Sequence, residues 1–142
     1  MKKLISFTAL CMAIFVAFCT AASAQNPEKQ PTPEELAATE TEHLENALKL
    51  EDWQVFYVDS TLQHDFAALE AELKEMQAAK VGNYDMYRDI QDKWMEQIDN
   101  SFKKWFTPAQ WKKYLKMGAG KSQKEREKRR AKIAKANKEI SE

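Results

Sequence analysis

Apolar residues recur at alternating intervals of three and four positions through much of the chain, which is the spacing of one face of an α-helix. The longest such stretch runs from about Asp52 to Lys80. Its apolar positions are Val55, Val58, Leu62, Phe66, Leu69, Leu73 and Met76. This spacing is close to the heptad repeat of coiled coils, and it predicts a helix roughly 40–45 Å long. We expect Gly82 to end this helix and Asn83 to cap the next one.

Three further helices are expected around this long one. The first begins at Thr32, a capping residue followed by proline at the first helical position. Another runs from about Tyr84 to Phe106. Its apolar face consists of Tyr87, Ile90, Trp94, Ile98, Phe102 and Trp105. A short fourth helix begins at Thr107 and is expected to stop at the glycines Gly118 and Gly120. No stretch alternates as a strand would, so the expected fold class is all-α.

The sequence pattern divides the chain into four predicted segments. Residues 1–24 have two early lysines, an apolar run and a final Ala-Ser-Ala, the pattern of a signal peptide cleaved after Ala24. The run is shorter than the roughly 20 residues of a membrane span. We therefore expect an exported, periplasmic protein. Residues 25–32 form a polar, proline-rich linker, residues 33–117 a helical domain, and residues 118–142 a basic charged tail, helical or disordered.

The positions of the cysteines and the distribution of charge along the chain limit the possible functions further. Both cysteines, Cys11 and Cys19, lie in the segment expected to be removed, so the mature chain should have no thiol and no disulfide. Residues 25–102 carry 18 acidic and 6 basic side chains, a net charge of −12, whereas residues 103–142 carry 14 basic and 4 acidic ones, a net charge of +10. The basic tail has three interpretations: a solubilising tail, a partner for the acidic helices, or a weak contact with anionic membrane lipids. Nucleic acid is not an expected partner of an exported protein.

The sequence shows no catalytic constellation. It lacks a haem-attachment motif, a glycine-rich phosphate loop and a GxSxG nucleophile turn, so we expect neither an enzyme nor a cofactor. His43 and His64 are the only histidines. Glu40 and His43 form half of the Glu-x-x-His arrangement of carboxylate di-metal bundles, but the residues before His64 do not supply the other half. No dedicated metal site is predicted, and weak metal binding at either histidine stays open.

The most specific local motif is FTPAQ, from Phe106 to Gln110. Thr107 is placed to cap a helix, Pro108 suits its first position, and Gln110 can bond back to the amide of Thr107. A weaker copy, LEDWQ, stands 56 residues earlier, from Leu50 to Gln54. Because glutamate caps helices less well than threonine, the earlier copy is either a second helix start or a bend in a continuing helix.

These two copies resemble the paired LTxxQ motifs of the Spy/CpxP family of small periplasmic stress proteins. Phe106 replaces the leucine in one copy, and Glu51 replaces the threonine in the other. The motif positions carried over are Leu50, Gln54, Phe106, Thr107, Pro108 and Gln110. The resemblance implies a four-helix, hairpin-like bundle with two long helices that pairs into a curved, antiparallel homodimer. It also implies an ATP-independent chaperone, or holdase, that binds unfolded or partly folded envelope proteins. Since some relatives restrain an envelope sensor, the alternative is a stress-signalling subunit that binds one such partner.

Aromatic residues are the last informative feature. Around Trp53 they exceed what one helical stripe can bury, because Phe56 and Tyr57 flank the apolar seam. They form either ordinary core and a dimer interface, or an adaptable surface for segments of other proteins. The residues predicted to contact a partner are Trp53, Phe56, Tyr57, Phe66, Trp94, Trp105 and Trp111.

Overall fold

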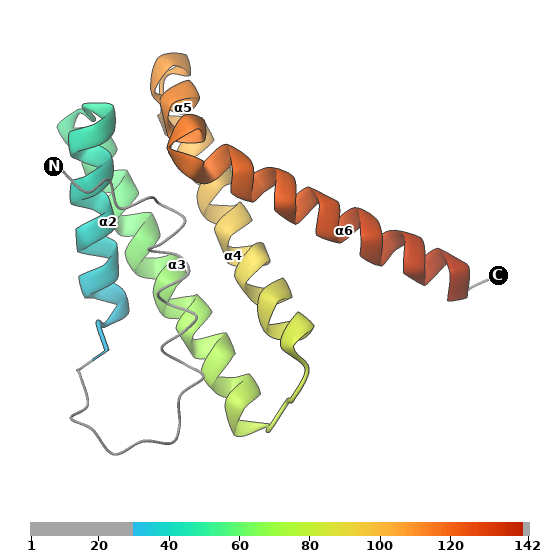
Figure 1. The fold of residues 1–142 in the computed structure, drawn as a ribbon. Coiled ribbons are helices and arrows are strands. Elements are labelled where there is room, and N and C mark those ends of the chain that lie inside the picture. Colours follow the sequence, from blue (N-terminus) through green and yellow to red (C-terminus); the bar gives the residue numbers. More distant parts are fainter. Residues whose placement is uncertain (1–29, 141–142) are drawn as a thin grey trace, which may run out of the picture. The chain divides into compact units, whose positions relative to one another are not determined.

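The computed structural model describes residues 30–140 (Figure 1). The expected signal peptide and both cysteines lie outside the described residues. Every regular element within residues 30–140 is helical and none is a strand, which confirms the all-α fold class. The elements are α2 (Pro33–Leu48), α3 (Asp52–Ala78), α4 (Tyr84–Trp105), α5 (Pro108–Tyr114), the π-helical segment η1 (Leu115–Ala119) and α6 (Gly120–Ile140). The chain forms two units, one spanning Lys29–Trp111 and one continuing from Lys112.

In the first unit, α3 lies between α2 and α4 and packs against both (Figure 1). Successive helices run in opposite directions, so the α2–α3 connection and the end of α4 lie at the same end of the unit. The buried residues of α3 are Gln54, Val58, Leu62, Asp65, Leu69 and Leu73. Val58 and Leu62 are almost fully buried, and each contributes about 1.5–3 kcal/mol relative to an exposed position. At the other end, Trp94 of α4 packs against Leu69 and Leu73.

The buried face of α3 differs from the predicted apolar seam. Val55, Phe66 and Met76 are only partly buried, while the polar residues Gln54 and Asp65 are buried. Asp65 is tolerated there because its Oδ1 accepts a hydrogen bond from Gln97 Nε2 of α4 at 3.0 Å. Lys93 and Glu72 form a second polar link between α3 and α4, at 2.6 Å. A helix packed on two sides buries a wider stripe than one apolar seam supplies, so polar residues fill the remainder.

Capping residues set the helix starts as predicted. Thr32 Oγ1 accepts a hydrogen bond from the Glu35 amide at 3.3 Å, and the Thr32 amide donates to Glu35 Oε2 at 2.9 Å. Asn83 Oδ1 accepts from the Asp85 amide at 2.9 Å and caps α4. These bonds satisfy amides that have no partner within the helix.

The prediction that Gly82 ends α3 is wrong. The reversal after α3 occurs at Lys80, which has a φ of 53°, and not at Gly82. The Val81 amide then donates to the Met76 carbonyl at 3.1 Å, the bond that closes a Schellman motif. Lys49 plays the same part after α2, with a φ of 56°.

The expected stop at Gly118 is confirmed, because Gly118 interrupts the helical backbone, whereas Gly120 is itself helical and begins α6. Gly118 has a φ of 128°, a conformation that an L-residue rarely adopts, and it bends the chain within η1. The helix α6 then begins at Gly120 and continues to Ile140. The glycines therefore mark a change of direction between helical segments, and the basic tail is helical from residue 120 to residue 140.

Candidate functional site

The two copies of the capping motif are both helix starts. At the later copy, the Gln110 amide donates to Thr107 Oγ1 at 3.3 Å and the Thr107 amide donates to Gln110 Oε1 at 2.9 Å, as predicted. At the earlier copy, the Glu51 amide donates to Gln54 Oε1 at 3.0 Å. The interpretation of the earlier copy as a bend in a continuing helix is wrong, because α2 ends at Leu48 and α3 begins separately at Asp52.

The two glutamines of the motif copies bind each other directly. Gln54 Nε2 donates to Gln110 Oε1 at 2.8 Å, and Gln110 Nε2 donates to Gln54 Oε1 at 3.0 Å. We call these two residues the glutamine pair. Gln54 is 1% exposed, so its amide depends on protein partners.

Each glutamine also reaches the backbone just before the other helix start. Gln54 Nε2 donates to the Trp105 carbonyl at 2.8 Å, and Gln110 Nε2 donates to the Lys49 carbonyl at 3.4 Å. Trp105 stands two residues before Thr107, and Lys49 stands two residues before Glu51. The hydrogen bonds therefore have an approximate two-fold symmetry, and both donors and the acceptor of each side-chain amide are used. The pair fixes the starts of α3 and α5 and the end of α4 against one another.

An exposed group of aromatic rings lies beside this pair. We call it the aromatic cluster, and its members are Trp53, Phe56, Tyr57 and Trp105. Trp53, Phe56 and Tyr57 are 48%, 66% and 45% exposed. The Tyr57 ring stacks on Trp105 with ring centroids 5.1 Å apart, and it meets Phe56 edge to face at 5.6 Å and Trp53 at 6.3 Å. Tyr57 therefore stands at the centre of the cluster and contacts the other three rings.

Local bonds connect the aromatic cluster to the glutamine pair. Trp53 precedes Gln54 in the chain, and the Trp105 carbonyl accepts the bond from Gln54. Trp53 Nε1 also donates to Glu51 Oε2 at 2.8 Å, so the glutamate at the position of Thr107 in the other motif copy orients this indole ring. The cluster is thus attached to a hydrogen-bonded end of the helical unit and not to a loop.

The remaining predicted partner-binding residues do not join the cluster. Trp94 is 9% exposed and belongs to the core between α3 and α4. Phe66 and Trp111 are partly buried. Among the motif residues, Phe106 is buried against the Phe102 ring with centroids 5.1 Å apart, and Leu50 is partly buried. Thr107 and Pro108 are exposed.

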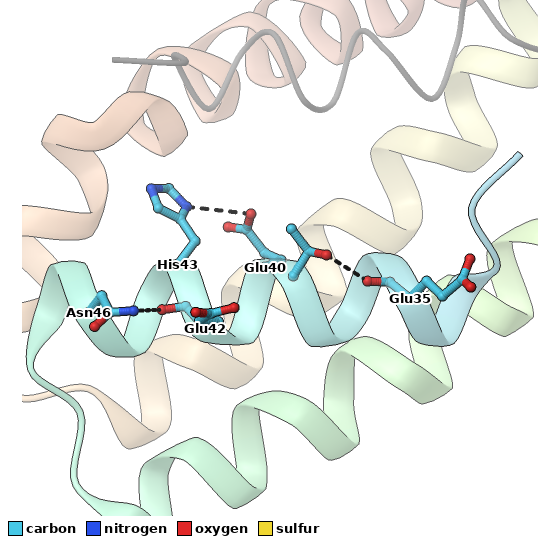
Figure 2. Close-up of polar contacts among 6 residues, drawn as sticks. Glu35, Glu40, Glu42, His43 and Asn46 are labelled. Carbon is cyan, nitrogen blue, oxygen red and sulfur yellow. Dashed lines mark hydrogen bonds and ion pairs between the residues drawn. The ribbon is translucent and has the colours of Figure 1, made fainter. Parts of the chain in front are cut away.

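Glu40 is a buried acid, although the sequence pattern marks it only as half of a metal motif. It is 4% exposed, and burial raises the pKa of its carboxyl to about 8. His43, one turn further along α2, has its Nδ1 3.5 Å from Glu40 Oε2 (Figure 2). The other polar contacts in Figure 2 are local to the helix, such as that from Asn46 Nδ2 to the Glu42 carbonyl at 2.9 Å.

The second histidine is paired separately, since His64 Nδ1 lies 2.8 Å from Asp65 Oδ1. Within residues 30–140, no group of three or more histidine, aspartate or glutamate side chains is arranged to hold a metal ion. In the same range, no helix has both the length and the apolar character of a membrane span. The chain matches no family model, no curated protein and no solved structure in the comparisons made.

Proposed function

We propose that this protein is an ATP-independent periplasmic chaperone that holds partly unfolded envelope proteins on its aromatic cluster. The observation that carries the proposal is the exposure of Trp53, Phe56 and Tyr57 within one set of ring contacts. Apolar surface gathered in this way on a soluble helical unit is typical of a protein-binding site. The paired motifs support the same function through their resemblance to the Spy/CpxP family.

The chemistry of the cluster suits weak binding of many segments. Aromatic rings present a large contact area with few rotatable bonds, and a pair of rings contributes about 0.5–1.5 kcal/mol beyond the area that it buries. A few such contacts hold an unfolded segment without trapping it. Release then needs no nucleotide, because the client leaves once its own core forms.

The glutamine pair gives the cluster a fixed base in this proposal. Because both helix starts are bonded to each other, Trp53 and Trp105 keep their separation when a client binds or leaves. We further propose that the protein acts as the curved, antiparallel homodimer implied by the resemblance, in which two clusters serve one client.

An aggregation assay tests the chaperone activity. An unrelated enzyme is unfolded and diluted in the presence of the purified protein without nucleotide, and light scattering is followed. The variant Phe56→Ser removes the most exposed ring of the cluster. Met86→Ser is the matched control, because Met86 is 47% exposed but lies at the start of α4, away from the cluster.

We expect the unmodified protein and Met86→Ser to suppress scattering near a stoichiometric ratio, and Phe56→Ser to need several-fold more protein. Equal activity of the two variants would remove the cluster from the proposal, and no suppression of several unrelated enzymes would remove the function. Crosslinking in cells distinguishes the alternative: a stress-signalling subunit would be recovered with one recurrent envelope partner, a chaperone with many.

A further inference from the structure

Five exposed lysines form a single line along α6. They are Lys121, Lys124, Lys128, Lys132 and Lys135, and we call them the lysine stripe. Their spacings of three, four, four and three residues keep all five on one side of an α-helix. At about 1.5 Å per residue the stripe is roughly 21 Å long. Each of the five residues is exposed.

Carboxylates neutralise little of this charge. Among residues 30–140, the ion pair recorded for the stripe joins Lys135 Nζ to Glu139 Oε1 at 4.0 Å, and both side chains are more than two-thirds exposed. Such a pair contributes little in water. Glu125 borders the stripe but lies to one side of it. The stripe therefore presents most of its positive charge to the solvent.

Arginines occupy a different side of the same helix. Arg126 and Arg130 lie on the side of α6 opposite the stripe and Arg129 lies between the two sides, and all three arginines interact with other groups of the protein. Arg126 is buried. Arginine suits fixed, bidentate contacts, whereas lysine is a compact, strongly hydrated charge on a flexible stem. The helix thus separates its arginines, which the fold engages, from lysines that remain available to an external anion.

We infer that the lysine stripe binds the anionic headgroup surface of a membrane. A straight row of charges on one side of a helix can meet a flat surface along its whole length at once. Clusters of four to eight basic residues on a helix are typical of such binding, and attraction falls off within about 10 Å at ordinary salt. The large apolar residue of this part of α6, Ile133, lies on a different side of the helix from the stripe, so the contact is peripheral.

Nucleic acid is the less suitable polyanion. The stripe contains no aromatic ring to stack on a base and no arginine, asparagine or glutamine to read one.

Vesicle co-sedimentation tests the inference with the purified protein. The probes are vesicles of phosphatidylcholine with phosphatidylglycerol, and vesicles of phosphatidylcholine alone. The test variant is Lys124→Gln, Lys128→Gln and Lys132→Gln combined. The control variant combines Lys112→Gln, Lys113→Gln and Lys116→Gln, which removes the same charge from exposed positions before α6. Far-UV circular dichroism checks that both variants keep their helices.

We expect the protein to bind the anionic vesicles and to be released by high salt. Each lysine near such a surface contributes about fivefold in partitioning, so the stripe variant should bind about a hundredfold more weakly. The control variant should retain most of the binding. The inference is overturned by equal binding to neutral vesicles, by equal losses in the two variants, or by tighter binding to duplex DNA in the same buffer. It stands apart from the chaperone proposal, since the stripe variant should suppress aggregation normally.

Discussion

Replacing Gln54 by alanine should destabilise the protein more than replacing an exposed glutamine by alanine. Gln54 is 1% exposed and its side chain takes part in four hydrogen bonds. The substitution leaves the Glu51 amide, the Trp105 carbonyl and the side-chain amide of Gln110 without their partner. Water replaces part of what Gln110 loses, because Gln110 is only partly buried.

The magnitude follows from these orphaned groups. A buried donor or acceptor left without a hydrogen bond costs about 1–3 kcal/mol. With the Trp105 carbonyl and the Glu51 amide losing their bonds at a buried position, we expect Gln54→Ala to lower the free energy of unfolding by about 3 kcal/mol. Gln110→Ala should cost about 2 kcal/mol, since water reaches its surroundings more easily.

A double-mutant cycle measures whether the two amides act together. Urea unfolding is followed by far-UV circular dichroism for the unmodified protein, both single variants and the double variant. The second substitution removes groups whose partners are already lost, so the double variant should cost at least about 1 kcal/mol less than the sum of the single ones. Gln63→Ala is the control, because Gln63 is exposed and bonds only to Asp59 of its own helix, at 2.7 Å.

Two results would refute this account of the glutamine pair. One is additivity of the two substitutions within about 0.5 kcal/mol, the value expected of independent sites. The other is a cost of Gln54→Ala no larger than that of Gln63→Ala, which would mean that the amide bonds contribute nothing beyond those of a solvated side chain.

Two smaller predictions concern stability alone. The folded-state pKa of Glu40, about 8, lies above its ordinary value of 4.5. The contribution of protonated Glu40 to the free energy of unfolding is therefore fully present below pH 4.5 and is lost as the pH rises towards 8. Glu40→Gln should therefore raise the free energy of unfolding at pH 7 by as much as about 3 kcal/mol and have little effect at pH 4.5, which urea unfolding at the two pH values checks; a variant that remains as pH-dependent as the parent would contradict it. Thr107→Ala should cost about 1 kcal/mol through loss of the cap on α5, and an unchanged Tm would show that Thr107 does not hold that helix start.

The starts of the helices could be predicted from the sequence, and the ends of α3 and α4 to within about two residues, but the residue that reverses the chain after each helix could not always be identified. Helix starts are predictable at Thr32, Asn83 and Thr107, because a short polar side chain there accepts a hydrogen bond from a specific backbone amide. At the ends the strongest expectation is glycine, which adopts positive φ without cost. Lysine takes that conformation at positions 49 and 80 instead. The closing backbone bonds compensate its cost, and no local residue pattern reveals them.

The candidate site was predictable in its parts but not in its assembly. The surplus of aromatics around Trp53 indicates that some rings must remain exposed, since one helical stripe cannot bury them all. The shared motif singles out both glutamines. That Gln54 binds Gln110 across 56 residues depends on the helix packing, which spacing along the chain does not encode. Buried Asp65 and Glu40 are missed for a related reason, because hydrophobic periodicity counts only apolar residues.

The hydrogen bonds of the glutamine pair involve no ionisable side chain. The contact between the two motif copies is therefore insensitive to pH and to salt. Neither amide gains or loses a proton at any pH at which proteins fold, and neither carries a charge that salt could screen. A rise in pH towards 8 therefore ionises Glu40, and a rise in ionic strength screens the lysines of α6, while the spacing of Trp53 and Trp105 stays the same. When the salt concentration around the protein changes, the aromatic cluster would therefore keep its geometry while the effective charge of the lysine stripe changes.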